Sequence, residues 1–259
     1  MDLHLAGKRA LITGASKGIG AAAAAVFAEE GCHLHLAARS EPALQALAQQ
    51  LQGRHGVEVT VHVVDLRRAA DLARLAKAAA DIDILVNNAG DIPGGPLDKV
   101  VEETWRHAWE LKVFGYINLT RTIYAQMKAR GGGVIINDIG AAGERFDFNY
   151  IAGSTGNAAL MAFTRTLGGR SLEDKIRVVG INPGPVETDR IISLMKTQAK
   201  NRLGDESRYP ELLARFPLGR AASPREIADM MAFLASDRSA YTSGVIVTID
   251  GGLCAGAGM

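Results

Sequence analysis

Short apolar runs alternate with alanine-rich or amphipathic segments along the whole chain. The apolar runs are rich in Val, Ile and Leu, which is typical of strands buried on both faces of a sheet. They predict strands at residues 10–13, 33–37, 57–64, 84–87, 134–137, 177–181 and 245–249. Between them, helical patterns begin near Gly18, Glu41, Ala69, Val101, Tyr150 and Pro224. This alternation predicts an α/β protein whose parallel sheet is covered by helices on both faces.

The chain shows no internal repeat, low-complexity linker or change in composition that would mark a domain boundary. Its 259 residues, 47% of them hydrophobic, suffice for one domain with a large core, and we expect a single domain over residues 1–259. Residues 187–220 lie outside the alternation, between the sixth strand and the helix near Pro224. An insertion of this length beyond the carboxyl end of a strand predicts a lid over a substrate site.

Charge and cysteine content exclude several classes of protein. A formal net charge of +1 does not favour electrostatic binding to nucleic acid or to an anionic membrane. Cys32 and Cys254 cannot form a disulfide framework, and the six histidines form no ligand cluster, so we expect no metal site. Since the pattern of a signal peptide and a membrane-spanning apolar run are both missing, we expect a cytoplasmic protein without membrane or nucleic-acid partners.

The segment TGASKGIG at residues 13–20 joins the first predicted strand to an alanine-rich helix. Its three glycines would allow a tight turn, close approach of backbone N–H groups to a pyrophosphate, and close packing of helix on strand. The helix N-terminus would then point its positive dipole end at the anion. The segment therefore predicts a dinucleotide site, with a plain loop between core elements as the alternative. The residues of this loop that we expect to bind the cofactor are Gly14, Ser16, Lys17, Gly18, Ile19 and Gly20.

The residues that follow the second predicted strand indicate which dinucleotide is preferred. Folds that prefer NAD usually place an acidic residue there to bond the adenosine ribose, but residues 37–40 read Ala, Ala, Arg, Ser. Lys17 in the glycine loop and Arg39 would instead place two cations near a 2′-phosphate. The sequence therefore favours NADP(H) over NAD(H), and ordinary solvated cations are the alternative.

Asp65 and Leu66 directly follow the third predicted strand, and we expect both to bind the cofactor. An aspartate at this place would hydrogen-bond the adenine amino group. A simple cap on the following helix is the alternative role for Asp65.

Five segments together resemble the single-domain branch of the short-chain dehydrogenase/reductase family. They are TGASKGIG at 13–20, Asp65, NNAG at 87–90, NPGPVET at 182–188 and VTIDGG at 247–252, and the resemblance runs from about Gly7 to Gly252. It implies a Rossmann-type doubly wound sheet of seven parallel strands, a nicotinamide cofactor, a small carbonyl or alcohol substrate, and a homotetramer or homodimer. It also implies cofactor contacts from Asn88, Ala89, Gly90, Tyr150, Pro183, Gly184, Val186 and Thr188.

The catalytic residues depart from the family pattern. Members usually carry a serine, a tyrosine, a lysine four residues after the tyrosine, and often an asparagine on the preceding helix. The tyrosine passes a proton as hydride moves, and the lysine favours its phenolate, since a free phenol has a pKa of ~10. Tyr150 matches the tyrosine, but Ser154 stands at the lysine position, Gly140 at the serine position and Lys112 at the asparagine position. The interval from Gly140 to Tyr150 is also shorter than usual.

Asp138 adds a further departure, because a carboxylate at the end of a buried strand requires a partner, and Lys112 is the candidate. In a first hypothesis the site is rewired: Lys112 supplies a cation to Tyr150, and Asp138 accepts a proton or positions Lys112. Ser154 would then bond the nicotinamide ribose. Separately, the missing hydroxyl at Gly140 could make room for a bulkier substrate or for a water. A solvated Lys112 and a water-facing Asp138 are the plain alternatives.

Two further hypotheses concern the reaction itself. Hydride transfer could be lost, which would leave the cofactor as a structural or sensing ligand. The scaffold could also enolise a substrate without net redox chemistry, as an isomerase or lyase does. We expect the first hypothesis to hold: an NADP(H)-dependent oxidoreductase acting on a ketone or secondary alcohol, with Tyr150 as proton donor.

Overall fold

Seven parallel strands form the centre of the molecule in the computed structural model, which describes residues 1–256. The strands are β1 (Arg9–Thr13), β2 (His33–Ala38), β3 (Val59–Val63), β4 (Ile84–Asn87), β5 (Gly133–Asp138), β6 (Ile176–Pro183) and β7 (Ile246–Ile249). They are hydrogen-bonded in the order β3-β2-β1-β4-β5-β6-β7. From β1 the chain adds β2 and β3 on one side of the sheet and β4 to β7 on the other, so the strand order reverses between β1 and β4. In open α/β sheets, ligands bind at such a switch point. The predicted Rossmann-type, single-domain fold is confirmed.

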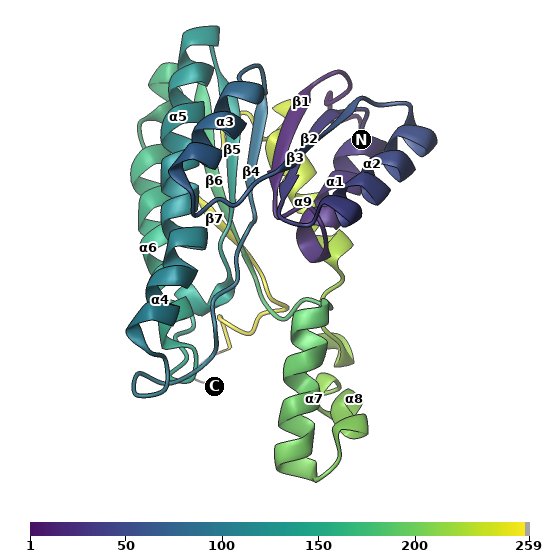
Figure 1. The fold of residues 1–259 in the computed structure, drawn as a ribbon, viewed down its shortest axis with the longest axis vertical. Helices are drawn as coiled ribbons and strands as arrows, with labels where there is room; N and C mark the ends of the chain where they lie inside the picture. The colour runs from purple at the N-terminus through teal and green to yellow at the C-terminus, as the bar shows by residue number, and fades with distance from the viewer. Residues whose placement is uncertain (257–259) are drawn as a thin grey trace.

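Helices cover both faces of the sheet (Figure 1). One face carries α1 (Gly18–Glu29), α2 (Glu41–His55) and α9 (Pro224–Ala235). The other carries α3 (Ala69–Ala78), α4 (Glu102–Trp109), α5 (Gly115–Arg130) and α6 (Ile151–Gly168). Two apolar layers, one on each face, make up most of the core. Within residues 1–256 we find no helix with the length and apolar character needed to cross a bilayer.

The strands lie where the apolar runs predicted them, but one predicted helix is divided. The helical pattern near Val101 becomes α4, a π-helical turn at Glu110–Phe114 and then α5. Apolar periodicity does not distinguish an α turn from a π turn over five residues, which is why the pattern predicted one helix. The π turn contains Lys112, and turns of this kind often occur at functional sites.

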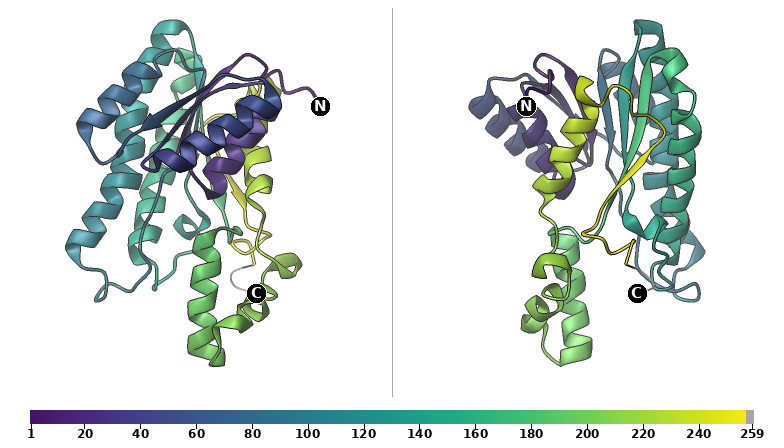
Figure 2. Two further views of the ribbon diagram at one scale, coloured as in Figure 1. Left: turned by 45° about the vertical axis from the view of Figure 1, so that its right-hand side comes forward. Right: turned by 180° about the vertical axis from the view of Figure 1, so that it is seen from behind.

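Residues 187–220 form a helical extension, which we call the α7–α8 segment. It contains α7 (Asp189–Leu203) and α8 (Tyr209–Leu213) and has a small apolar cluster of its own. In Figure 1 and in both views of Figure 2, the segment projects beyond the carboxyl ends of the strands. Its two ends meet where Val186 bridges to Ala222. The segment is therefore anchored at the edge of the sheet where a ligand would bind.

A chain of buried hydrogen bonds fixes the ends of β4 and β5 against α5 and α6. Asn87 Nδ2 donates to Asn137 Oδ1 at 2.9 Å and to Thr120 Oγ1 at 3.0 Å. Asn137 Nδ2 in turn donates to Thr164 Oγ1 at 2.9 Å. All four side chains are almost fully buried, so their polar atoms require partners within the protein. This chain holds together the strand and the helix that carry candidate catalytic residues.

We expect Thr164→Val to lower the free energy of unfolding by about 1–3 kcal/mol, because Asn137 Nδ2 would be left buried without its acceptor. Urea denaturation followed by circular dichroism measures this change. Thr155→Val is the matched control. Thr155 also lies in α6 and donates to a carbonyl four residues earlier, as Thr164 does, but it is exposed. We expect the control to change stability by less than about 0.5 kcal/mol. Equal losses in the two variants would contradict the prediction.

Candidate active site

The turn after β1 has no room for side chains at its glycines. A Cβ on Gly14 would lie 2.7 Å from Asn88 Nδ2, and a Cβ on Gly20 would lie 2.4 Å from the Gly14 carbonyl oxygen. Gly14 and Gly18 also have positive φ angles, of 67° and 58°. Asn88 Nδ2 donates to the Thr13 carbonyl at 2.8 Å, which ties the turn to the end of β4. The three glycines are therefore required by the geometry of the loop.

The N-terminus of α1 is open to an anion. Lys17 is its N-cap residue, and the Lys17 side chain makes no capping hydrogen bond. The first turn of α1 contains no acidic residue. Backbone N–H groups at such a helix end, together with the helix dipole, bind phosphate groups well. The residues present therefore fit the pyrophosphate of a dinucleotide.

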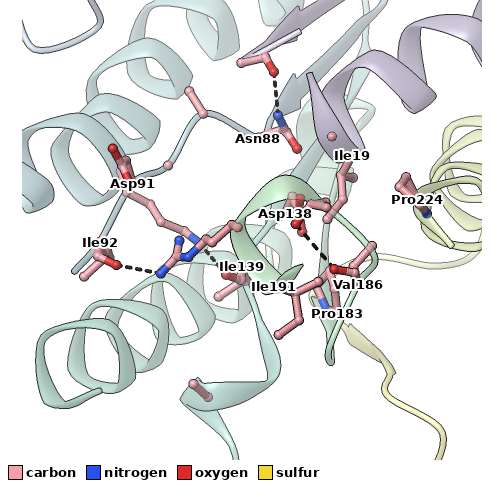
Figure 3. Close-up of a pocket in the computed structure, with 18 of the residues that line it drawn as sticks. Ile19, Asn88, Asp91, Ile92, Asp138, Ile139, Pro183, Val186, Ile191 and Pro224 are labelled. Carbon is pink, nitrogen blue, oxygen red and sulfur yellow. Dashed lines mark hydrogen bonds between the residues drawn. The ribbon is translucent and has the colours of Figure 1, made fainter. Parts of the chain in front are cut away.

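A cavity of about 1760 Å³ begins at this loop, follows the carboxyl ends of the strands and reaches α7. Figure 3 shows side chains around it, among them Ile19, Asp138 and Val186. A pocket for one small molecule is usually ~300–1000 Å³, so this cavity has room for a dinucleotide and a substrate. The predicted cofactor residues that line it are Gly14, Ser16, Lys17, Gly18, Ile19, Arg39, Leu66, Asn88, Ala89, Gly90, Tyr150, Pro183, Gly184, Val186 and Thr188.

Asp65 has a different environment from the one predicted. It does not line the cavity, and its carboxylate is taken up by Arg67. Asp65 Oδ1 accepts from Arg67 Nε at 2.8 Å and from the Arg67 backbone N–H at 3.1 Å, and Oδ2 accepts from Arg67 Nη2 at 2.5 Å. These bonds hold the pKa of Asp65 below its ordinary value. Asp65 is not the helix cap either, because the N-cap residue of α3 is Arg68.

Tyr150 is the N-cap residue of α6 rather than part of its first turn. Its ring covers Gly153: a Cβ there would lie 2.0 Å from two ring carbons, Cε1 and Cζ. Tyr150 Oη accepts a hydrogen bond from Arg190 Nη2 at 3.1 Å. Arg190, in the first turn of α7, also donates to the Ile92 carbonyl at 2.6 Å (Figure 3). The phenol is therefore in contact with a cation that comes from the α7–α8 segment.

Lys112 and Asp138 influence each other's charge in the same cavity. Lys112 Nζ donates to the Ile139 carbonyl, and a Cβ on Gly90 would lie 2.9 Å from Lys112 Cδ, so glycine leaves room for the lysine side chain. Burial lowers the pKa of Lys112 to about 8, and the charge of Asp138 opposes this shift. Burial raises the pKa of Asp138 to about 6, and the charge of Lys112 opposes it. Two groups that change protonation near neutral pH are typical of functional sites.

The structure brings Tyr150, Lys112 and Asp138 to one cavity, but it connects them differently from the first hypothesis. Among residues 1–256, Lys112 forms neither a hydrogen bond to Tyr150 nor an ion pair with Asp138. The reason is that the ammonium group is held at the carbonyl of Ile139, directly after β5. The hydrogen-bonded cation of Tyr150 is Arg190 instead.

Ser154 and Gly140, both predicted at the catalytic centre, do not line the cavity. Ser154 Oγ accepts from the Asp147 backbone N–H at 3.2 Å, so it holds the loop before Tyr150. Because Ser154 is only the acceptor in this bond, its contact with a nicotinamide ribose stays a prediction.

Asn157 lines the cavity although the sequence pattern did not single it out. Its Nδ2 donates to the Gly140 carbonyl at 3.2 Å, and its buried Oδ1 has no partner in the part of the chain that the structure describes. Asn157 follows Tyr150 by seven residues, which is about two helical turns. This spacing could have predicted that the two side chains lie on the same side of the helix. Arg190 was visible only as one of many cations in the predicted lid.

Known proteins resemble this chain over almost its whole length. The family model described as enoyl-(acyl carrier protein) reductase matches residues 14–254. Oxidoreductase UcpA of Escherichia coli (strain K12) is 36% identical over 253 residues, which cover 96% of this chain and 95% of that protein. L-sorbose reductase from Gluconobacter frateurii, complexed with NADPH and L-sorbose, has a TM-score of 0.92 at 35% identity, covering 98% and 99% of the two chains. A 7α-hydroxysteroid dehydrogenase, complexed with NADH and 7-oxo glycochenodeoxycholic acid, has a TM-score of 0.86 at 30% identity, covering 97% and 96%.

We expect Asp138→Asn to remove a pH dependence of stability. The carboxyl group titrates near 3.8 in the unfolded chain, whereas its pKa in the folded chain is about 6. Between these values the folded chain binds the extra proton, so the free energy of unfolding falls as pH rises from about 4 to about 6. The difference in pKa corresponds to roughly 3 kcal/mol. Urea denaturation between pH 4 and pH 7 should show this loss in the wild type but not in Asp138→Asn.

Asp229→Asn is the control, because the Asp229 side chain is 53% exposed on α9. Its stability should follow that of the wild type across the same pH range. A difference between wild type and Asp138→Asn that stays constant from pH 4 to pH 7 would show that Asp138 titrates normally.

Proposed function

The chain belongs to the short-chain dehydrogenase/reductase family, and from this premise we propose that it is an NADP(H)-dependent oxidoreductase acting on a ketone or secondary alcohol. The observation that carries the proposal is the single cavity that joins the glycine loop to Tyr150. Reduction of a carbonyl requires a hydride at its carbon and a proton at its oxygen. Tyr150 is the group that we assign to proton donation.

The glycine loop and the N-terminus of α1 would hold the pyrophosphate, and Pro183, Gly184 and Thr188 would lie at the nicotinamide end. The cofactor, when bound, supplies or accepts the hydride. Lys17 and Arg39 are exposed, both line the cavity, and residues 37–40 at the end of β2 include no acidic residue, which supports the 2′-phosphorylated cofactor. The NADPH in the L-sorbose reductase complex agrees with this preference, whereas the NADH in the hydroxysteroid dehydrogenase complex shows a relative with the other cofactor.

Lys112 and Asp138 would supply one positive and one negative charge next to the reacting atoms. With pKa values of about 8 and about 6, the ammonium and the carboxylate are both mostly charged at pH 7. We assign them as an electrostatic pair next to the reaction centre. Asn157, whose buried Oδ1 faces no partner among residues 1–256, is a further candidate to bond a ligand in this cavity.

The outer part of the cavity favours a substrate with an apolar body. Phe146 and Phe148 are 74% and 71% exposed, and Leu194 on α7 is 48% exposed, yet all three line the cavity. Apolar side chains exposed around one cavity indicate a ligand that covers them. The substrate class that we propose is therefore a ketone or secondary alcohol that carries an apolar group.

We expect the purified protein to oxidise NADPH in the presence of ketones, followed by absorbance at 340 nm over a panel that ranges from sugars to bulky ring ketones. Tyr150→Phe should lower kcat by about 100-fold or more, because general acid catalysis contributes roughly that much. Tyr209→Phe is the control, since Tyr209 lies in the α7–α8 segment and does not line the cavity.

Two results would contradict this proposal. Tight binding of NADPH with no turnover of any ketone would support a sensing or structural role for the cofactor. Exchange of solvent deuterium into a ketone without oxidation of NADPH would support an isomerase or lyase.

We expect Arg39→Asp to lower the affinity for NADPH by about 10- to 100-fold and to leave or improve the affinity for NADH. The reason is the loss of a charge-assisted hydrogen bond to the 2′-phosphate, worth ~1.5–3 kcal/mol. Titration of cofactor fluorescence measures both dissociation constants. Arg54→Asp, an exposed change of the same charge on α2 outside the cavity, should alter neither. Equal losses of affinity for the two cofactors in Arg39→Asp would contradict the assignment.

A further inference from the structure

The contact between Arg190 and Tyr150 joins two parts of the molecule. Arg190 Nη2 lies 3.1 Å from Tyr150 Oη, and the guanidinium carbon lies 5.5 Å from the centre of the Tyr150 ring. The same nitrogen donates to the Ile92 carbonyl at 2.6 Å, in the loop after β4 (Figure 3). The guanidinium thus links the first turn of α7 to the start of α6 and to the loop after β4.

The chemistry of arginine decides the direction of this hydrogen bond. A guanidinium group has five N–H donors and no acceptor, so Tyr150 Oη must be the acceptor. The hydrogen of the phenol is therefore left for another acceptor, and Tyr150 lines the cavity where such an acceptor can lie. The positive charge of Arg190 also favours a phenolate once that hydrogen has left.

Other groups that could serve Tyr150 make no hydrogen bond to its hydroxyl among residues 1–256. Lys112 donates to the Ile139 carbonyl, and Ser154 is uncharged and bonded to the loop before Tyr150. Among residues 1–256, the only cation with a hydrogen bond to Tyr150 Oη is Arg190. The other charged residues that line the cavity are Lys17, Arg39, Asp91, Lys112, Asp138, Arg145, Asp147, Glu187, Asp189 and Asp250.

We propose that Arg190 is the catalytic cation of this site, which orients the Tyr150 hydroxyl for proton donation and stabilises the phenolate that remains. This inference rests on the proposed reductase function. In the reduction, the O–H bond of Tyr150 breaks and a new O–H bond forms on the substrate oxygen. The substrate carbon gains hydride from NADPH, which becomes NADP⁺. The electron pair of the broken O–H bond stays on the Tyr150 oxygen, beside Arg190, until a solvent proton replaces the one transferred.

Because Arg190 belongs to α7, the assembly of the proton donor depends on the α7–α8 segment. Tyr150 has its cation only while the first turn of α7 lies against the Ile92 carbonyl. The α7–α8 segment therefore contributes the cation that contacts Tyr150 as well as residues that line the cavity.

The direct test is the ionisation of Tyr150 in the whole protein labelled with ¹³Cζ-tyrosine. The chain has five tyrosines, and the resonance lost in Tyr150→Phe identifies the one of interest. We expect Arg190→Met to move the ionisation of Tyr150 to higher pH than in the wild type, with Arg190→Lys in between, because Arg190 Nη2 lies 3.1 Å from the phenol oxygen. Circular dichroism at each pH confirms that the chain is folded.

Lys196→Met is a closely matched control. Lys196 is also in α7, and its ammonium nitrogen lies 5.6 Å from the centre of the Tyr209 ring. The control should leave the Tyr150 resonance unchanged. An unchanged ionisation of Tyr150 in Arg190→Met, or an equal shift in Lys196→Met, would overturn the inference. A larger shift in Lys112→Met than in Arg190→Met would overturn it too, because it would assign the catalytic cation to Lys112.

Kinetics supply the second readout. Arg190→Met should lower kcat by about 10- to 100-fold with a smaller change in KM, and the alkaline limb of its kcat profile should move to higher pH. Lys196→Met should leave kcat unchanged. The ionisation of Tyr150 is measured without substrate, so its outcome stands even if the wild type turns over no ketone, a result that would contradict the proposed function alone.

Discussion

The close approach of the chain after β1 to the chain after β4 determines most of the site. Gly14 and Gly20 leave room for Asn88, whose side chain bonds back to the end of β1. This contact shapes the phosphate loop and sets the N-terminus of α1 at the switch point of the sheet. It also places Gly90, over which the Lys112 side chain passes on its way to the carbonyl after β5. The phosphate-binding end and the reacting end of the cavity therefore depend on the same backbone contact.

The two cations of the reacting end differ in a way that matters for catalysis. Burial lowers the pKa of Lys112 to about 8, so its charge decreases in the pH range where a phenolate becomes important. A guanidinium keeps its charge over the whole of that range. An exposed arginine also avoids most of the desolvation cost that a buried lysine carries. Because Arg190 contacts Tyr150, the cation with the constant charge lies at the residue that we propose as proton donor.

The fold could be predicted because strands buried on both faces need continuous apolar runs, and the glycine loop because its backbone geometry excludes other residues. The contact of Arg190 with Tyr150 could not, since it joins residues 40 positions apart through a segment without strand periodicity. The bond from Ser154 to Asp147 was hidden for a related reason: the direction of a side chain depends on where α6 begins. Assembly into a homotetramer or homodimer and a cytoplasmic location stay predictions.

The space around Tyr150 explains how this chain can place the proton donor that we propose. Tyr150 lies outside the helix, yet its ring occupies the volume that Gly153 leaves open within the first turn of α6. A larger residue at 153 would displace the phenol from this place, since a single Cβ already comes within 2.0 Å of its ring carbons. Lys112 and Arg190 likewise reach the cavity from elements other than α6. Because a reacting group acts through its location in space, the loss of a motif residue in this family does not by itself indicate the loss of the chemistry.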